Sequence, residues 1–242
     1  KSRGIATGEA AAAAMIANGI GDNSAPPPAG LYTPGPPDPG KWQLTPSCTS
    51  GGGVFLNWRT VTPFGIRSVD RFISDPPPSL TSRRYTNDYK EVKRVGAIDS
   101  DPADRPQDRT DVARFYAAAS PAFVFNTAAQ QVSTAQRRSL SHTARALALL
   151  NMAINDSLVT SCATKYHYDY WRPETAIRAG ESDGNDKTEG DPTFAPLIIT
   201  PCFPSYPSNH ASGSYGGADI LERIYGAGRH AITLTGTVAG SP

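Results

Sequence analysis

The chain has 242 residues, with 23 Lys and Arg against 22 Asp and Glu, and a net charge of +1. That length allows one sizeable buried core, and the balanced charge gives no support for wholesale binding to nucleic acid or to a membrane surface. No run of 18 or more apolar residues occurs. The sequence therefore predicts a soluble protein with no membrane span, whose partner is a small molecule.

The first half of the chain is predicted to be a helix followed by an extended arm. Alanine dominates residues 5–18, and alanine has the highest helix propensity. Most of the 22 prolines then fall within 24–106, where neither a long helix nor a central strand can persist. Large apolar side chains recur there, so we interpret this stretch as a Pro-rich arm packed on a helical body. One short helix is predicted over 86–95, with Thr86 or Asn87 as its cap.

Residues 107–242 are predicted to form that helical body, which carries the candidate site. Apolar side chains recur there at helical spacing, and Pro and Gly separate the segments. The expected helices are 108–119, 133–160, 165–172 and 211–225. Because helix follows helix without strand-like alternation, the predicted fold class is all-α, and 1–242 is predicted to be a single helical domain, cut from a longer protein.

Three cysteines and one acidic stretch are the candidates for a disulfide or a metal site. Cys48, Cys162 and Cys202 are too few for a disulfide framework and lack CxxC spacing, so at most one bridge can form. The acidic residues of 180–191 have neither the spacing nor the closing Glu of an EF-hand loop. We interpret that stretch as a solvated loop.

Two short segments carry the candidate chemistry, KYHYDYWRPETAIR at 165–178 and PSNH at 207–210. Lys165 and Arg172 are seven residues apart, so a continuous helix would project both cations from one face, about 10 Å apart along its axis. An ammonium and a planar guanidinium together can bind one small oxyanion. The alternative is two surface cations, one of them paired with Asp169. The aromatic residues between them argue against an exposed face.

The PSNH segment is predicted to begin a helix. The free N–H groups and the dipole of a helix N-terminus favour negative charge. His210 would lie in the first turn behind Ser208, where an imidazole can serve as general acid or base in the same pocket. A histidine that only caps or packs is the alternative.

Both segments resemble motifs of a known superfamily. KYHYDYWRP matches the K-x6-RP motif, and PSNH is close to the PSGH motif, of the vanadium-dependent haloperoxidase and type 2 phosphatidic acid phosphatase superfamily. The run FPSYPSNHASGSYGGA and the W-x2-V-x-PF piece at 58–64 look like the bacterial haloperoxidase-like branch. The resemblance implies a helical bundle of the haloperoxidase and acid phosphatase type.

The resemblance also implies a role for each motif residue. Lys165 and Arg172 would bind the oxygens of vanadate or phosphate, Ser208 and the amide of Asn209 would hydrogen-bond them, and His210 would be the acid or base. Asn209 replaces the usual Gly. Its amide is still available, and Asn tolerates unusual backbone angles better than most residues.

The third motif of the superfamily, SR-x3-G-x-H, is not found. It would supply a second Arg and the His that attacks phosphorus or ligates vanadium. Arg223, Gly228 and His230 come close, but Arg and His are seven residues apart rather than six, and Glu222 stands where Ser is expected. The vanadium-ligating His is therefore expected beyond Pro242, and no metal ligand is assigned in this chain.

The resemblance implies two activities for one pocket. A haloperoxidase would hold vanadate and oxidise halide with hydrogen peroxide, with Lys165 polarising the peroxide. A phosphatase would use the same cations on the phosphoryl group of a phosphate ester, with a phosphohistidine intermediate and His210 protonating the leaving alcohol.

Phe203 lies seven residues before His210, where the chlorinating members resemble this chain and the brominating ones carry His. Phe203 is accordingly a candidate halide-site residue, with plain core as the alternative. A non-catalytic oxyanion-binding homologue and an all-α interaction protein without a site are the remaining readings. The sequence does not indicate which halide or ester is used, or whether the chain forms a homo-oligomer.

Overall fold

The computed structural model describes residues 2–24, 31–228 and 230–235. Within these ranges the regular structure is helical and no strand is formed, which confirms the predicted all-α fold class. The α-helices are α1 (Ser2–Asn18), α2 (Arg83–Gly96), α3 (Gln107–Ala118), α4 (Pro121–Ala135), α5 (Leu140–Tyr168), α6 (Pro173–Arg178) and α7 (Asn209–Tyr225). Short 3-10 turns are η1 (Leu56–Thr60), η2 (Asp70–Phe72) and η3 (Gly180–Ser182).

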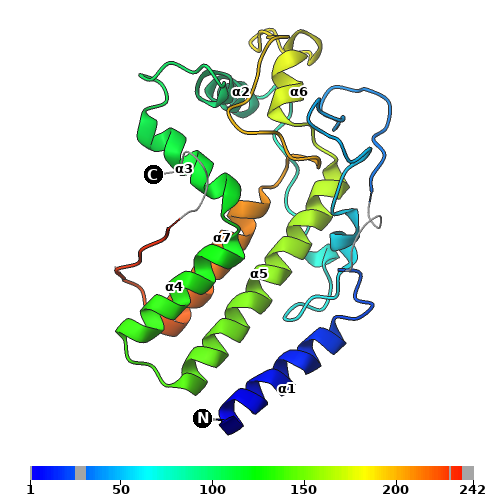
Figure 1. Cartoon of the computed structure of the whole chain (residues 1–242). Helices are drawn as coiled ribbons and strands as arrows, with labels where there is room; N and C mark the ends of the chain where they lie inside the picture. Colours follow the sequence, from blue (N-terminus) through cyan, green and yellow to red (C-terminus); the bar gives the residue numbers. More distant parts are fainter. Residues whose placement is uncertain (1, 25–30, 229, 236–242) are drawn as a thin grey trace.

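The long helix α5 is the centre of the fold, and α4 and α7 pack along it (Figure 1). Ala129 of α4 meets Leu150 and Ile154 of α5 in a buried cluster. Burying an aliphatic side chain of this size contributes about 1.5–3 kcal/mol. Helix α7 can approach closely because Gly217 has no side chain: a Cβ there would lie 2.9 Å from the ring of Phe125.

The helix predicted over 133–160 is divided between α4 and α5, which corrects the sequence prediction. Arg137, in the connection, adopts a left-handed conformation with φ of 51°. Ser139 then caps α5, its hydroxyl accepting from the amide of His142 at 3.3 Å. A local turn and a strong cap therefore interrupt an apolar pattern that reads as continuous in the sequence.

The predicted cap of the arm's helix is also wrong. Helix α2 begins at Arg83, and Ser82 is its cap, with the Ser82 hydroxyl accepting from the amide of Tyr85 at 3.1 Å. Thr86 is instead buried inside the helix and accepts a hydrogen bond from the Asn185 side chain at 2.9 Å. The position of the tertiary partner, rather than the local cap preference, decides the role of Thr86.

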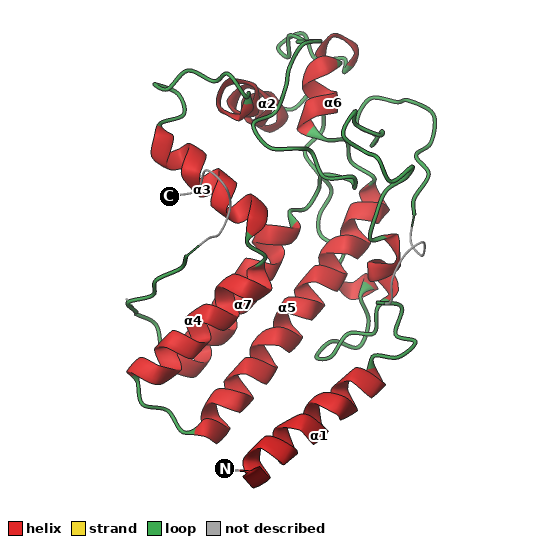
Figure 2. Ribbon diagram, viewed as in Figure 1, coloured by secondary structure: helices red, strands yellow, loops and turns green. Residues whose placement is uncertain are grey.

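Part of the Pro-rich stretch, blue in Figure 1 and among the green loops of Figure 2, lies across the end of the bundle where α5 stops. Trp42 is fully buried, and its amide donates to the carbonyl of Asp169 at 2.8 Å. A disulfide joins Cys48 to Cys202, 154 residues later, in the segment that leads to α7. Cys162 is a buried free thiol. The one bridge that the sequence allowed therefore ties the stretch to the neighbourhood of the PSNH turn.

The acidic loop at 180–191 is not fully solvated, contrary to the interpretation from sequence. Asp183 is buried, and its carboxylate accepts from the hydroxyl of Thr188 at 2.7 and 2.9 Å and from the amide of Asn185 at 2.8 Å. Within the described ranges, no group of three or more His, Cys, Asp and Glu residues is placed to hold a metal ion. Asp183 therefore organises its own loop.

Helix α5 has the length and the apolar composition of a membrane-crossing helix, by those two criteria alone. The core helix of a bundle meets the same criteria. Because α5 packs against α4, α7 and η1, its apolar face has partners within the fold.

Candidate functional site

Lys165 and Arg172 do not lie on one helix, which corrects the prediction of a continuous 165–172 helix. Helix α5 ends at Tyr168, and Asp169 follows in a left-handed conformation with φ of 54°. Arg172 is extended, with ψ of 151°, and is the N-cap residue of α6. The physical reason is Pro173, because the residue before a proline is disfavoured in the helical region while proline itself readily begins a helix.

Lys165 is almost fully buried, at 1% exposure, near the end of α5. Its Nζ donates to the carbonyl oxygens of Pro204 at 3.1 Å, of Ser205 at 3.0 Å, and of Pro207. An ammonium group has three N–H bonds, so these three carbonyls use its full donor capacity. Lys165 therefore fastens the segment 204–207 to the bundle.

Arg172 lies beyond the break between α5 and α6 and contacts Phe203, the residue before this segment. Its Nε donates to the carbonyl oxygen of Phe203 at 2.6 Å. Its Nη2 is buried and has no hydrogen-bond partner among the described residues. The Phe203 ring is shared by both cations, with its centroid 4.6 Å from Arg172 Cζ and 5.1 Å from Lys165 Nζ. A different backbone path thus still brings the two positive groups to one place.

The electrostatics of this pair are unusual because no carboxylate neutralises it. No ion pair involving Lys165 or Arg172 occurs in the described part of the chain. Burial, and then the neighbouring charge of Arg172, lower the pKa of Lys165 to about 7. Burial lowers the pKa of Arg172 to about 10, so its guanidinium stays charged at neutral pH. Two positive groups that are buried or partly buried and have no acidic partner favour an external anion.

The start of α7 is as the PSNH segment predicts. Ser208 is the N-cap, and its hydroxyl accepts from the amide of Ala211 at 3.2 Å. Asn209 has helical backbone geometry, so its tolerance of unusual angles is not used. Its side-chain oxygen accepts from the hydroxyl of Ser161 at 2.7 Å, and its amide nitrogen lies 3.8 Å from the sulfur of Cys162. These contacts fix the start of α7 one helical turn away from Lys165.

His210 lies in the first turn of α7 and its side chain is exposed. No hydrogen bond of the described residues joins it to Lys165 or Arg172. His230 is also exposed, with Nε2 3.3 Å from the carbonyl of Gly226, and Arg223 pairs with Asp219 at 2.7 Å. The structure thus gathers the two cations, Phe203 and the start of α7, and leaves both histidines outside that contact network.

No role was predicted from the sequence for Asp156, which holds residues 64–65 against α5. Its carboxylate is nearly buried on α5 and accepts from the backbone amides of Phe64 at 2.7 Å and Gly65 at 2.6 Å. Phe64 is the last residue of the W-x2-V-x-PF piece, and Gly65 follows it. A lone carboxylate within an apolar helix stripe was the available signal, because a buried charge needs partners.

The residues present fit a tetrahedral oxyanion. Arg172 offers a buried N–H donor without a partner among the described residues, and the charge of Lys165 lies nearby. Lys165 fits only after one of its three carbonyl partners gives way to an anion oxygen. Arg172 is therefore the ready donor, and Lys165 is a donor that must change partner.

Comparison with known proteins gives three similarities. Residues 145–241 match the family model described as the VCPO second helical-bundle domain. Vanadium chloroperoxidase of Curvularia inaequalis is 26% identical over 69% of this chain and 32% of that protein. The crystal structure of the first bacterial vanadium-dependent iodoperoxidase shares the fold, with a TM-score of 0.69 at 23% identity over 86% of this chain and 49% of that one. The chain therefore spans about a third and about a half of these relatives.

Proposed function

Since this chain is a member of the vanadium-dependent haloperoxidase superfamily, we propose that it forms the oxyanion-binding part of an enzyme that oxidises halide with hydrogen peroxide. The cofactor of this proposal is vanadate, held in a pocket of the phosphate type. The observation that supports it is the pair of buried Lys165 and partly buried Arg172, which has no carboxylate partner in the described ranges. Such a pair is costly unless an anion binds to it.

In this proposal Arg172 is the main ligand of the oxyanion. Its Nε is held by the carbonyl of Phe203, which leaves the Nη groups to grip oxygens in the fixed geometry of a guanidinium. The Asn209 amide and the Ser208 hydroxyl, at the start of α7, add donors of the kind that favour negative charge. The chemistry that vanadate supplies when bound is the activation of hydrogen peroxide toward halide oxidation.

Lys165 and His210 would handle protons in this scheme. Lys165 has a pKa of about 7, so at neutral pH it can both hold and release a proton beside the anion. His210 is exposed in the first turn of α7, where an imidazole can exchange protons with solvent. The Phe203 ring, packed on both cations and 6.0 Å from the ring of Phe55, keeps water from one side of the charged groups.

The test is an activity assay of the full-length gene product with and without added vanadate. We expect bromide and hydrogen peroxide to halogenate a dye only when vanadate is present. Hydrolysis of a phosphate monoester without vanadate would instead support the phosphatase alternative, since the same cations can bind a phosphoryl group. Oxyanion binding without either turnover would identify a non-catalytic homologue.

We expect the affinity for sulfate to fall as the pH rises through about 7, the pKa of Lys165. A bound anion favours the ammonium form of Lys165. Above that pKa, Lys165 must therefore take up a proton before it can bind the anion. Each further pH unit then weakens binding by up to about tenfold. Isothermal titration between about pH 6 and pH 9 measures this, because sulfate itself does not titrate there.

The matched control for this pH dependence is Lys165→Met. That variant should bind sulfate more weakly at low pH and show a flat profile, because the titrating group is gone. A dissociation constant of the unsubstituted protein that stays constant across the same range would contradict the assignment of the proton to Lys165.

A further inference from the structure

A cavity of about 270 Å³ lies beside the turn that begins α7. Lys165 and Arg172 do not line it. Its walls come from α2, from residues 170–171 and α6, and from the segment 205–208. They are largely aromatic or apolar. Its aromatic and proline lining includes Tyr85, Tyr89, Tyr170, Trp171, Tyr206 and Pro207. An engineered cavity of about 150 Å³ is large enough for benzene, so this one has room for a single substituted ring.

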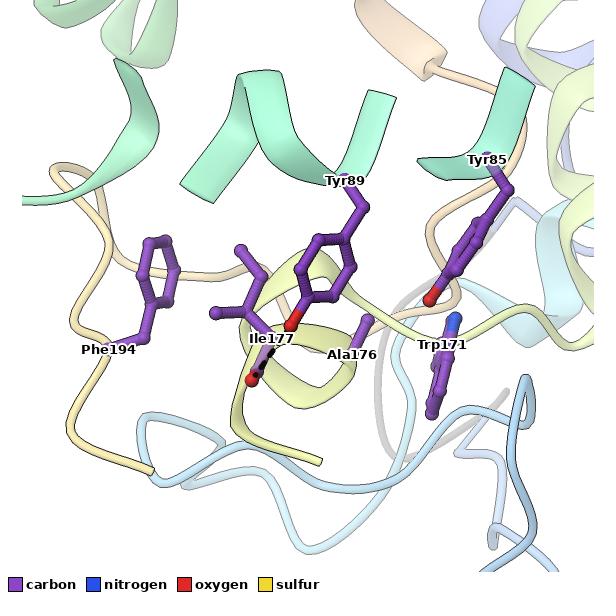
Figure 3. Packing of buried hydrophobic residues seen from close by; sticks show 6 residues of the cluster. All are labelled: Tyr85, Tyr89, Trp171, Ala176, Ile177 and Phe194. Atoms are coloured by element: carbon purple, nitrogen blue, oxygen red, sulfur yellow. Dashed lines mark hydrogen bonds between the residues drawn. The ribbon is translucent and has the colours of Figure 1, made fainter. Parts of the chain in front are cut away.

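Three buried polar atoms of residues that line the cavity have no hydrogen-bond partner of good geometry among the described residues. They are the hydroxyls of Tyr85 and Tyr170 and the indole Nε1 of Trp171. Tyr85 is 7% exposed and Trp171 is 3% exposed. Figure 3 shows the Tyr85 hydroxyl and the Trp171 nitrogen pointing toward one another, without a bond between them. Both groups can donate a hydrogen bond to an acceptor atom of a ligand.

Tyr89 shows that a tyrosine hydroxyl in this region can be satisfied within the protein. Tyr89 lies one turn after Tyr85 on α2 and belongs to the same buried cluster, but its hydroxyl donates to the carbonyl of Glu189 at 2.8 Å. The nearby carboxylate of Asp183 is occupied by Thr188 and by the amide of Asn185. Native proteins rarely leave buried donors unpaired, and three in one wall indicate a place for a ligand.

Burial raises the pKa of Tyr85, and the Asp183 carboxylate raises it further. Burial also raises the pKa of Tyr170. Both hydroxyls therefore keep their protons at neutral pH. Both hydroxyls can donate a hydrogen bond, and the indole N–H of Trp171 can only donate one, so the matching ligand atom is a hydrogen-bond acceptor.

We infer that this cavity binds a single aromatic ring carrying a hydrogen-bond-accepting oxygen, of the phenol or aromatic carbonyl class. The aromatic walls suit a flat ring, and the unpaired donors of Tyr85 and Trp171 suit its oxygen. Pro207 and Ser208 line the cavity, and Pro207 also accepts from Lys165, so the ring would lie next to the oxyanion turn. That the bound ring is the organic substrate rests on the proposed function, whereas the binding of the ring to this cavity does not.

The test uses 4-hydroxybenzaldehyde as the probe and isothermal titration as the measurement, on the full chain. We expect the unsubstituted protein to bind it, and Tyr85→Phe to bind it about tenfold more weakly, because one hydrogen bond to the ligand is lost. The matched control is Tyr89→Phe, whose hydroxyl is already paired within the protein. That variant should bind the probe within about twofold of the unsubstituted protein.

Toluene, a ring without the oxygen, is the matched ligand. It should bind the unsubstituted protein and Tyr85→Phe equally. No binding of 4-hydroxybenzaldehyde, or the same loss of affinity in both tyrosine variants, would overturn the inference. Because these titrations contain no vanadate, they are independent of the halogenation assay: probe binding without halogenation removes the proposed function alone, and halogenation without probe binding removes this inference alone.

Discussion

Replacing Arg172 by glutamine is expected to weaken vanadate binding about a hundredfold. The guanidinium is the one buried donor of the cation pair with a free N–H among the described residues, and truncating a buried charged hydrogen-bonding group typically costs about 2–5 kcal/mol of binding free energy. Isothermal titration with orthovanadate measures the change. Arg172→Lys should recover only part of the affinity, because an ammonium lacks the planar fork.

Arg178 provides the control for Arg172. It is the last residue of α6, the helix that Arg172 caps, but it is paired with Glu174 at 2.9 Å and bonded to the carbonyl of Phe194. Arg178→Gln should therefore leave the vanadate dissociation constant within about threefold. Thermal unfolding of each variant without ligand checks that the fold is intact. Equal affinities of Arg172→Gln and the unsubstituted protein would remove Arg172 from the site.

Breaking the Cys48–Cys202 disulfide is expected to lower the free energy of unfolding by about 2–5 kcal/mol. The bridge closes a loop of 154 residues and so restricts the unfolded chain strongly. It also holds the Pro-rich stretch next to Phe203, which packs on both cations. Urea unfolding with and without reductant, together with a Cys48→Ser, Cys202→Ser variant, measures the loss.

Cys162 distinguishes this effect from a general effect of reductant. It is a buried free thiol whose pKa burial raises to about 11, so it is unreactive at neutral pH. A Cys162→Ala variant should lose as much stability on reduction as the unsubstituted protein does. The double serine variant should lose nothing further. An unchanged urea midpoint under reducing conditions would mean that the bridge contributes nothing to stability.

Much of the fold could be predicted because the helices have apolar periodicity and the breaks have Pro or Gly. The all-α class and the helix that follows Ser208 are examples. The break after Tyr168 could not be predicted from periodicity, since aromatic residues continue across it. It follows from Pro173 and from Asp169, whose carbonyl accepts from the amide of Trp42, more than a hundred residues earlier. A local pattern does not contain such a partner.

For the candidate site, the sequence predicted that Lys165 and Arg172 come together but not the contacts that they make. The motif spacing selects Lys165 and Arg172 in the right neighbourhood, although the geometry assumed for them was wrong. The three carbonyls that occupy Lys165 are backbone atoms, and backbone atoms carry no sequence signal. The unpaired hydroxyl of Tyr85 likewise becomes visible only when its surroundings are known.

Helix α5 sets the spacing of the contacts at this end of the molecule. At Asp156 it holds the amides at 64–65, and at Ser161 and Lys165 it holds the stretch 204–209, through the side chain of Asn209 and the carbonyls of Pro204, Ser205 and Pro207. Each residue of an α-helix advances the chain by about 1.5 Å and turns it by about 100°. A single alanine inserted between Ser161 and Lys165 would therefore swing the ammonium away from its loop while the helix itself survives.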